Sequence, residues 1–259
     1  MAYLKIIDGR KIRVGKIVAL VKNYEAHAAE MSEMEWRVGN RQSGFENRVD
    51  LPRYLPRGSR GTSARRYEPR NPNSESRAPN PAFFLKPSTS IIHDGENIVL
   101  PEQSKEVHHE VELAVVIGKK CKNAAPEDAM KYVFGYAVAL DITARDIQAQ
   151  AKEKGMPWAM AKGFDTFCPI GDAAPKEKVH APENLEISLK INGGVRQRGS
   201  TSAMVHKIAP TISYISKIMT LERGDVILTG TPEGVGAVKK GDVLEAEIEG
   251  LPKLENTVV

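Results

Sequence analysis

The stretch at residues 109–118, H-E-V-E-L-A-V-V-I-G, constrains the fold more than any other part of the chain. Its glutamates alternate with apolar residues, which is the period-two pattern of a strand with one face in a core. On such a strand Glu110 and Glu112 share one face, roughly 6.5 to 7 Å apart, while Val111 and Leu113 point into the core. Two like charges beside a core are costly to desolvate unless a cation neutralises them. The stretch therefore predicts a site for a hard divalent metal.

A third carboxylate, Asp141, stands at the end of the apolar stretch 133–140, which predicts a buried strand, and precedes a helix expected to begin near Thr143. Strand ends are places where sites assemble. Three carboxylates with three waters or substrate oxygens give the octahedral oxygen shell that Mg²⁺ or Mn²⁺ prefers, whereas Zn²⁺ or Cu²⁺ would call for His or Cys ligands. The alternative is that Glu110 and Glu112 form a solvated strand face and that Asp141 only caps the helix.

The composition is typical of a soluble globular protein. The chain has 259 residues, of which 41% are hydrophobic, enough for a proper core. No run approaches the ~18 apolar residues of a membrane span, and the N-terminus lacks the features of a signal or transit peptide. Cys121 and Cys168 have neither metal-binding nor redox spacing. We therefore expect a cytoplasmic protein with reduced thiols and no membrane partner.

Residues 32–80 differ from the rest of the chain, and we expect boundaries at 1–31, 32–80 and 81–259. This segment holds 10 Arg, no Lys and 6 acidic residues, so it alone accounts for the net charge of +4. It is also rich in Pro, Asn, Ser and Gly, which predicts a disordered insertion or even a coding artefact. The functional alternative is an electrostatic tether for nucleic acid or an acidic partner. The interleaved acids argue against nucleic-acid binding.

A second polar group precedes that segment. After a strand expected at 16–21, residues Asn23 to Met31 predict a helix capped by Asn23. His27 and Glu30 are three residues apart and so share one helical face. A carboxylate beside an imidazole fixes its tautomer and raises its basicity, as a general base requires. The alternative is a surface ion pair without a role.

Further cationic and polar residues lie near the expected strand ends. Asp141, Arg145 and Gln148 have the i, i+4, i+7 spacing of one helix face and would project toward the metal, although Arg145 could instead pair with a neighbouring acid. Lys162 would be positioned to bind a substrate carboxylate or oxyanion, but a lone Lys is more often an ordinary surface residue. Lys86 is a lone cation near the end of another apolar strand.

The C-terminal third predicts mainly β structure. An alternating stretch at 185–191 leads into a hairpin turn at 192–194, and strands are expected at 225–228 and 243–248. The glycine loop at 230–236 lacks the ending of a phosphate-binding P-loop and is followed by no helix, which excludes a nucleotide site. Many short strands with few helices indicate a mixed, β-dominated α+β fold.

Taken together, these residues resemble the fumarylacetoacetate hydrolase superfamily, and most of all its acylpyruvate hydrolase and oxaloacetate decarboxylase branch. The resemblance covers residues 17–31 and 82–259 in matching order and spacing, and it outweighs the separate alternatives above. It rests on these motifs: K-N-Y at 22–24 with His27 and Glu30, F-L-K-P at 84–87, H-E-V-E-L at 109–113, D-I-T-A-R-D at 141–146, Lys162, and G-T-P-E-G-V-G at 230–236.

The resemblance implies a β-roll or sandwich, usually a homodimer, that acts on a small 2-oxo acid. Family members pass from the lid helix to the next strand in a short connection, so the segment 32–80 puts lid closure in doubt, but not the metal site. The implied roles are Mg²⁺ or Mn²⁺ ligands at Glu110, Glu112 and Asp141, a catalytic dyad of His27 and Glu30 on a mobile lid, a substrate lysine at Lys162, and substrate-binding positions at Lys86, Arg145, Gln148 and Thr231.

The implied activity is Mg²⁺-dependent hydrolysis of the C–C bond of acylpyruvates such as fumarylpyruvate and acetylpyruvate, or decarboxylation of oxaloacetate. The metal would stabilise the pyruvate enolate, and His27, oriented by Glu30, would activate the water that only hydrolysis needs. Isomerisation of 2-hydroxyhepta-2,4-diene-1,7-dioate, and hydration or tautomerisation of 2-oxo acids, are alternatives within the superfamily. A binding protein that acts through 32–80 is the alternative of another class, and the intact site residues argue against it.

Overall fold

The computed structural model describes residues 2–30 and 80–259. Nearly all of the expected insertion at 32–80 therefore lies outside the described residues. Its expected disorder and the expected domain boundaries stay predictions.

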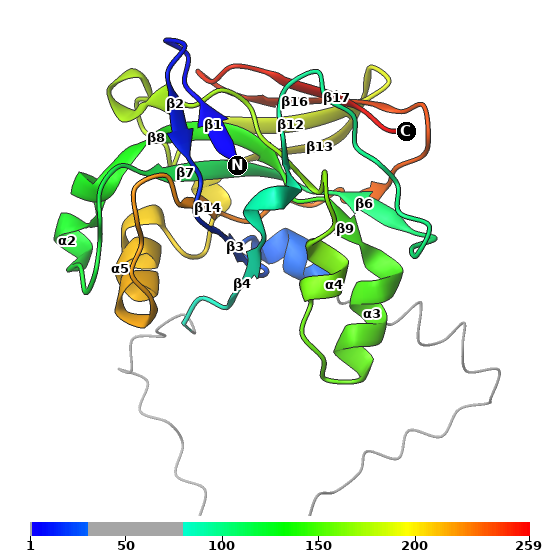
Figure 1. Ribbon diagram of the computed structural model, residues 1–259, viewed down its shortest axis with the longest axis horizontal. Helices are drawn as coiled ribbons and strands as arrows, with labels where there is room; N and C mark the ends of the chain where they lie inside the picture. Colours follow the sequence, from blue (N-terminus) through cyan, green and yellow to red (C-terminus); the bar gives the residue numbers. More distant parts are fainter. Residues whose placement is uncertain (1, 31–79) are drawn as a thin grey trace, which may run out of the picture.

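Six strands form a central sheet in the order β11-β8-β7-β14-β3-β4 (Figure 1). Strand β3, near the N-terminus, pairs in parallel with β14 and antiparallel with β4. The segments on either side of the undescribed residues therefore share one sheet. The strands are β3 Ile17–Leu20, β4 Phe83–Lys86, β7 Val111–Ile117, β8 Val133–Leu140, β11 Ala174–Pro175 and β14 Val226–Leu228.

A four-stranded antiparallel sheet, β13-β12-β16-β17, packs over one face of the central sheet (Figure 1). Strand β12 alternates between buried residues, Ile187 and Leu189 among them, and more exposed ones. Its buried side chains join Leu113 and Val115 of β7 in one apolar core, as expected for two sheets packed face to face. The strands are β12 Glu186–Ile191, β13 Gly194–Ser200, β16 Val243–Ile248 and β17 Leu254–Thr257.

The opposite face of the central sheet is also covered. Ala114 and Val116 of β7 and Ala137 of β8 join Leu4 of the N-terminal hairpin in a second apolar cluster. Because both faces of β7 are buried, its sequence is a nearly continuous apolar run. By strand alternation, Glu112 lies on the same face as Ala114 and interrupts that run. The hairpin consists of β1 Tyr3–Lys5 and β2 Lys11–Arg13.

The remaining strands form small sheets, and the helices are short. Helix α2 packs against α5, while α3 and α4 pack together beside β9 (Figure 1). The small sheets are β15-β6-β9 and β10-β5, with β5 Ile91–Ile92, β6 Val107–His109, β9 Thr143–Ala144, β10 Cys168–Pro169 and β15 Gly236–Ala237. The α-helices are α2 Pro126–Ala129, α3 Arg145–Glu153, α4 Ala159–Lys162 and α5 Ile208–Ile218, with residues 25–30 also helical and 3₁₀ turns at Ser88–Ser90, Met130–Tyr132, Lys176–Lys178 and Thr201–Ala203.

The predicted fold class, a β-dominated α+β fold, is confirmed. The buried strand expected at 133–140 is β8. The helix expected to begin near Thr143 begins instead at Arg145. The reason is that residues 143–144 pair with β6 as the short strand β9 before the chain turns helical.

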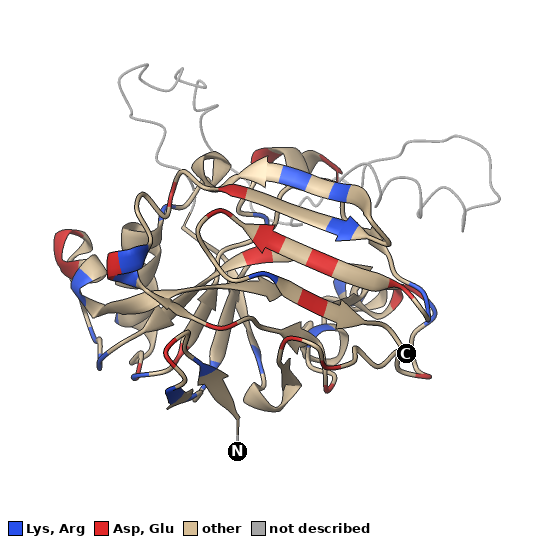
Figure 2. Ribbon diagram, turned by 90° about the horizontal axis from the view of Figure 1, so that it is seen from above, with Lys and Arg blue, Asp and Glu red and all other residues tan. Residues whose placement is uncertain are grey.

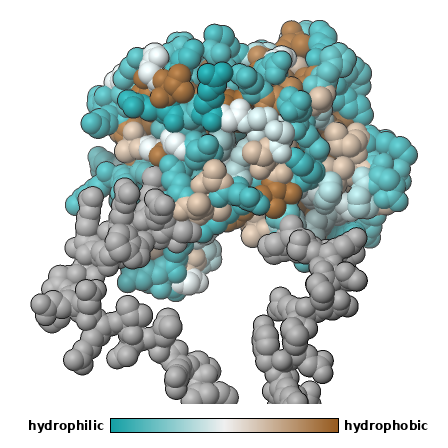
Figure 3. Space-filling view, turned by 180° about the vertical axis from the view of Figure 1, so that it is seen from behind, coloured by the Kyte–Doolittle hydropathy of each residue, from teal (hydrophilic) through white to brown (hydrophobic). Residues whose placement is uncertain are grey.

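The described surface is mainly polar. No helix among residues 2–30 and 80–259 is long and apolar enough to cross a membrane. On the four-stranded sheet, basic residues lie on the edge strand β13, both signs occur on β12, and acidic residues lie on β16 and β17 (Figure 2). The exposed Arg198 pairs with Glu186. On the face in Figure 3, the apolar side chains lie scattered among hydrophilic ones. The outer face of this sheet is therefore not the single-sign surface that favours binding to a polyanion.

Candidate metal centre

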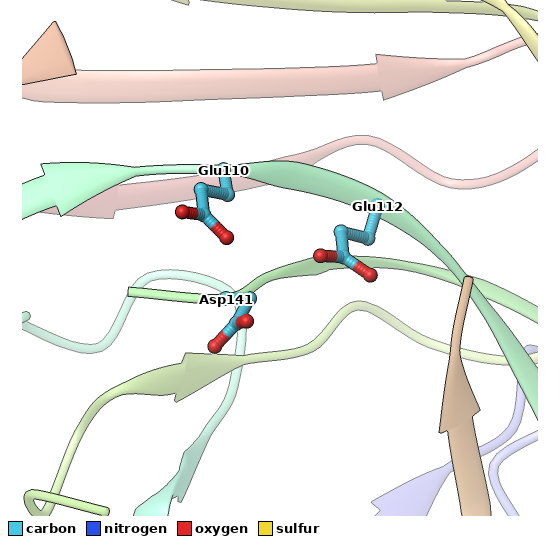
Figure 4. A group of neighbouring side chains, drawn as sticks. All are labelled: Glu110, Glu112 and Asp141. Carbon is cyan, nitrogen blue, oxygen red and sulfur yellow. The ribbon is translucent and has the colours of Figure 1, made fainter. Parts of the chain in front are cut away.

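Glu110 occupies a break between two strands. Strand β6 ends at His109 and β7 begins at Val111, because β6 leaves the central sheet to pair with β9 and β15. Asp141 directly follows β8, the antiparallel neighbour of β7, and its backbone N–H donates to the Glu110 carbonyl at 2.8 Å. One carboxylate oxygen from each of Glu110, Glu112 and Asp141 lies within 4.8 Å of the others. Figure 4 shows the three side chains converging from these two neighbouring stretches.

The predicted carboxylate cluster is deeply buried and accompanied by cations. Lys162 Nζ lies 3.0 Å from Glu110 Oε2 and 2.5 Å from Asp141 Oδ2. Lys86 Nζ donates to Asp141 Oδ1 at 2.7 Å, and Arg145 Nη2 donates to Glu110 Oε1. Burial favours the neutral amine of Lys162, but Asp141 and Glu110 outweigh it and raise its pKa. Lys162 is therefore an ammonium ion at neutral pH.

The charge balance is uneven among the three carboxylates. Burial opposes ionisation of Glu110, but the adjacent Lys162 and Arg145 hold its pKa well below the ordinary value. Glu112 forms no ion pair within the described part of the chain, and its Oε2 accepts the N–H of Gly230 at 2.5 Å. Burial, together with the two neighbouring carboxylates, raises the pKa of Glu112 well above its ordinary value. The electrostatics of the cluster therefore favour an additional positive charge beside Glu112.

The donor set fits a hard divalent cation. Glu112 and Asp141 are each 1% exposed, and the ligand atoms that the cluster offers are all carboxylate oxygens. Such oxygen donors suit Mg²⁺ or Mn²⁺. Three protein ligands also leave coordination positions open toward the cleft.

An open cleft leads to this cluster. Phe84 and Trp158 line it, with ring centroids 5.8 Å apart. Of the predicted site residues, it is lined by Glu110, Glu112, Lys162, His27, Arg145, Gln148 and Thr231.

Two predicted site residues are placed differently from the expectation. Asp141 does not share a helix face with Arg145, because β9 separates Asp141 from the start of α3. Arg145 reaches the cluster nonetheless, and it also donates to Gln148 Oε1 at 2.7 Å and His108 Nδ1 at 3.3 Å. Lys86 is 1% exposed and contacts Asp141 from behind rather than lining the cleft. Contact between Lys86 and a substrate therefore stays a prediction.

The predicted pair His27 and Glu30 lies on the other wall of the cleft. His27 Nδ1 is 3.4 Å from Glu30 Oε2, and both Glu30 oxygens accept the N–H of Gly234 at 3.1 Å. Burial lowers the pKa of His27 below its ordinary value of 6.5, against the opposing effect of Glu110. At neutral pH the imidazole is therefore uncharged and able to accept a proton.

Two structural residues were missed or misassigned from the sequence. Asn23 does not cap the helix at 25–30, because its side chain accepts the His206 N–H at 2.6 Å and donates to the Thr229 carbonyl at 2.8 Å. It therefore ties the start of this helix to the strand end beside the cluster. Gln197 reaches the site from the second sheet and was missed. Gln197 is a polar residue at a buried position of β13, and this burial is the feature that marks it. Residue spacing within one segment does not reveal that burial.

The chain belongs to the fumarylacetoacetate hydrolase family: the family model described as "Fumarylacetoacetate (FAA) hydrolase C-terminal" matches residues 16–259. This confirms the family predicted from the motifs.

Several relatives of the chain are named enzymes. The mitochondrial oxaloacetate tautomerase FAHD1 of Bos taurus is 52% identical over 178 residues, which cover 68% of this chain and 80% of that protein. The structure of fumarylpyruvate hydrolase from Pseudomonas aeruginosa, in complex with Mn²⁺ and pyruvate, has a TM-score of 0.79 and 33% identity and covers 99% of this chain and 95% of that chain. The 2-hydroxyhepta-2,4-diene-1,7-dioate isomerase from Mycobacterium marinum has a TM-score of 0.69 and 32% identity, covering 97% and 81%.

Proposed function

We propose that the protein is a divalent-metal-dependent enzyme that hydrolyses the C–C bond of acylpyruvates. One observation carries this proposal: two members of a cluster of three buried carboxylates within 4.8 Å, Glu110 and Glu112, line a cleft that His27, paired with Glu30, also lines. The similarity to a fumarylpyruvate hydrolase that binds Mn²⁺ and pyruvate supports it.

Glu110, Glu112 and Asp141 would hold Mg²⁺ or Mn²⁺. The bound metal would supply Lewis-acid stabilisation of the enolate of a 2-oxo acid. Three cationic side chains already contact the cluster, which itself has three carboxylates. A divalent metal therefore leaves an excess of positive charge, and a substrate with a carboxylate and a developing enolate would neutralise it.

His27 would act as the general base of hydrolysis. The Glu30 carboxylate can only accept the hydrogen of Nδ1, so Nε2 is the basic nitrogen of the neutral ring. That nitrogen would take a proton from the water that attacks the distal carbonyl of an acylpyruvate. Glu30 would keep the ring in the required tautomer.

The substrate would be bound by Lys162, Arg145, Gln148 and Thr231. Lys162 is a fixed ammonium ion beside Glu110 and Asp141, so it is suited to holding a carboxylate or a developing oxyanion. Arg145 and Gln148 are hydrogen-bonded to each other on α3 and face the same cleft. They would orient the substrate carboxylate.

A second candidate activity is turnover of oxaloacetate, by decarboxylation or by keto–enol tautomerisation. The 52% identity to an oxaloacetate tautomerase favours it. These reactions pass through the same enolate, but they need no attacking water. Lys162 and the three carboxylates would therefore be required for both reactions. Decarboxylation forms the enolate by loss of CO₂ and would not need His27 as base, whereas tautomerisation needs a base for the C3 proton, and the neutral His27 would take it. A cytoplasmic location and a homodimer remain proposals from the sequence.

The test is a substrate panel assayed before and after removal of divalent metal. EDTA-treated protein is assayed with acetylpyruvate, fumarylpyruvate, oxaloacetate and 2-hydroxyhepta-2,4-diene-1,7-dioate, and then again with added Mg²⁺ or Mn²⁺. We expect acylpyruvate cleavage to need the added metal. Cleavage that persists in EDTA, or turnover of the dienoate alone, would contradict the proposal.

A further inference from the structure

Gln197 joins the two sheets at the point where the metal-binding strand is broken. It lies on β13 of the outer sheet and is 1% exposed. Its Oε1 accepts hydrogen bonds from Val111 N at 3.1 Å and from His109 Nδ1 at 3.0 Å. Its Nε2 donates to Thr231 Oγ1 at 2.7 Å and to the Pro232 carbonyl at 2.9 Å. One buried amide therefore connects both strands beside Glu110 to the glycine loop at 230–236.

The orientation of this amide follows from its backbone partners. The N–H of Val111 can only donate, so it requires the oxygen of Gln197, and the carbonyl of Pro232 can only accept, so it requires the nitrogen. Since the amide oxygen cannot donate, His109 must carry its hydrogen on Nδ1.

The amide in turn sets the direction of the Thr231 hydroxyl. Because Thr231 Oγ1 accepts from Gln197, its own hydrogen stays available, and no acceptor for it is found in the part of the chain that the structure describes. Thr231 lines the cleft together with Glu112. We propose that Gln197 is a positioning residue that makes the Thr231 hydroxyl a hydrogen-bond donor to the carboxylate of the bound 2-oxo acid.

The glycine loop is seated on β13, which fixes the distance between the two side chains. Gly234 has φ +93°, and a Cβ there would lie 2.2 Å from the Arg196 carbonyl oxygen. A Cβ on Gly199 would lie 2.9 Å from Cβ of Pro232. Both contacts require glycine, so the backbones approach as closely as they can. Gln197 can therefore orient Thr231 without any movement of the loop.

This arrangement suits an anionic ligand atom. Gln197 Nε2 occupies one of the two lone pairs of the Thr231 hydroxyl, so the hydroxyl hydrogen must point away from Gln197, where it can donate to a carboxylate oxygen. The identity of the ligand rests on the proposed function. The orientation of the Gln197 amide and its effect on the Thr231 hydroxyl are independent of that function.

The test is a double-mutant cycle read by pyruvate binding at saturating Mn²⁺ with isothermal titration calorimetry. The variants are Gln197→Met, Thr231→Val and the double variant, with Thr231→Ser as the conservative control. A lost hydrogen bond to a charged group predicts about tenfold to hundredfold weaker pyruvate binding for each single variant. The double variant should bind no more weakly than Thr231→Val alone, and Thr231→Ser should retain binding.

Independent losses that multiply in the double variant, or unchanged binding in Gln197→Met, would overturn the inference. If wild-type protein with Mn²⁺ does not bind pyruvate, the proposed function and the assigned ligand fail together.

A measurement on the unsubstituted protein covers the case in which Gln197→Met does not fold. The ¹⁵N shifts of His109 should show that Nδ1 carries a hydrogen. A bare Nδ1 would mean that the amide is reversed and that Thr231 is not oriented as a donor, which overturns the inference.

Discussion

The two walls of the cleft differ in burial and in how the chain supports them. On one wall, Glu112 and Asp141 are each 1% exposed and belong to neighbouring strands of a sheet that is covered on both faces. On the other wall, His27 and Glu30 belong to a short helix at 25–30, and the Glu30 side chain is 24% exposed. Asn23 anchors the start of that helix, and the N–H of Gly234 holds Glu30.

This difference separates two kinds of chemistry. A metal site needs its ligands held in place before substrate arrives, and the carboxylate wall meets that need. Water activation is required only for hydrolysis, and it is assigned to the helix wall. Changes in the carboxylate wall are therefore predicted to affect every reaction, whereas changes in the helix wall should affect hydrolysis much more than decarboxylation.

The largest effect is expected in the carboxylate wall. Glu112→Gln or Asp141→Asn should lower both acylpyruvate hydrolysis and oxaloacetate turnover by more than about a hundredfold. Losing only a residue that hydrogen-bonds to a metal ligand typically costs about 10- to 100-fold, and a lost ligand should cost more. Steady-state assays of both reactions give the measurement, and circular dichroism checks folding. The matched control is Glu247→Gln. Glu247 lies on β16 and pairs with Lys253, so this variant should keep nearly normal activity. Near-normal turnover by both site variants would show that the carboxylate wall is not required for catalysis.

A selective effect is expected in the helix wall. His27→Ala should reduce acylpyruvate hydrolysis by about 10²- to 10⁴-fold, the usual contribution of a general base. Oxaloacetate decarboxylation should change far less, because loss of CO₂ forms the enolate without an attacking water. The ratio of the two rates in the same preparation is the readout. Equal losses would show that the helix positions substrate for both reactions instead.

The smallest effect concerns pH. Because burial lowers the pKa of His27 below 6.5, the ring should remain a base at pH 6.5 and lose activity only in more acid solution. Hydrolysis should then fall about tenfold per pH unit below that pKa as the ring gains its proton. A pH profile of kcat/KM gives the midpoint, and His27→Ala should lack this acid limb. A midpoint above 6.5, or the same limb in the variant, would assign the titration to another group.

The carboxylate wall was readable from sequence because its signals are local. Alternation around Glu110 and Glu112, and the apolar run that ends at Asp141, each fit within one strand, and those strands pair as neighbours. The spacing of His27 and Glu30 likewise lies within one helical turn. Local periodicity therefore predicted the β-dominated fold and placed Glu110 with Glu112 and His27 with Glu30. Their roles as metal ligands and catalytic dyad came from the family resemblance and stay predictions.

The connections between distant segments were not readable in this way. Gln197 lies 86 positions from Val111, and Asn23 lies 206 positions from Thr229, so no period within one element joins these partners. Arg145 was expected on one helix face with Asp141, because a two-residue strand such as β9 leaves too short a pattern to recognise. Contacts of this kind depend on how the sheets are stacked.

The most direct test of the metal centre is to titrate EDTA-treated protein with Mn²⁺ and to monitor binding through the electron paramagnetic resonance signal of the free ion. The three buried carboxylates predict one Mn²⁺ per chain, with affinity reduced more than about a hundredfold in Glu112→Gln and unchanged in Glu247→Gln. Wild-type protein that binds no Mn²⁺, or Glu112→Gln protein that binds it as tightly as wild type, would contradict the account.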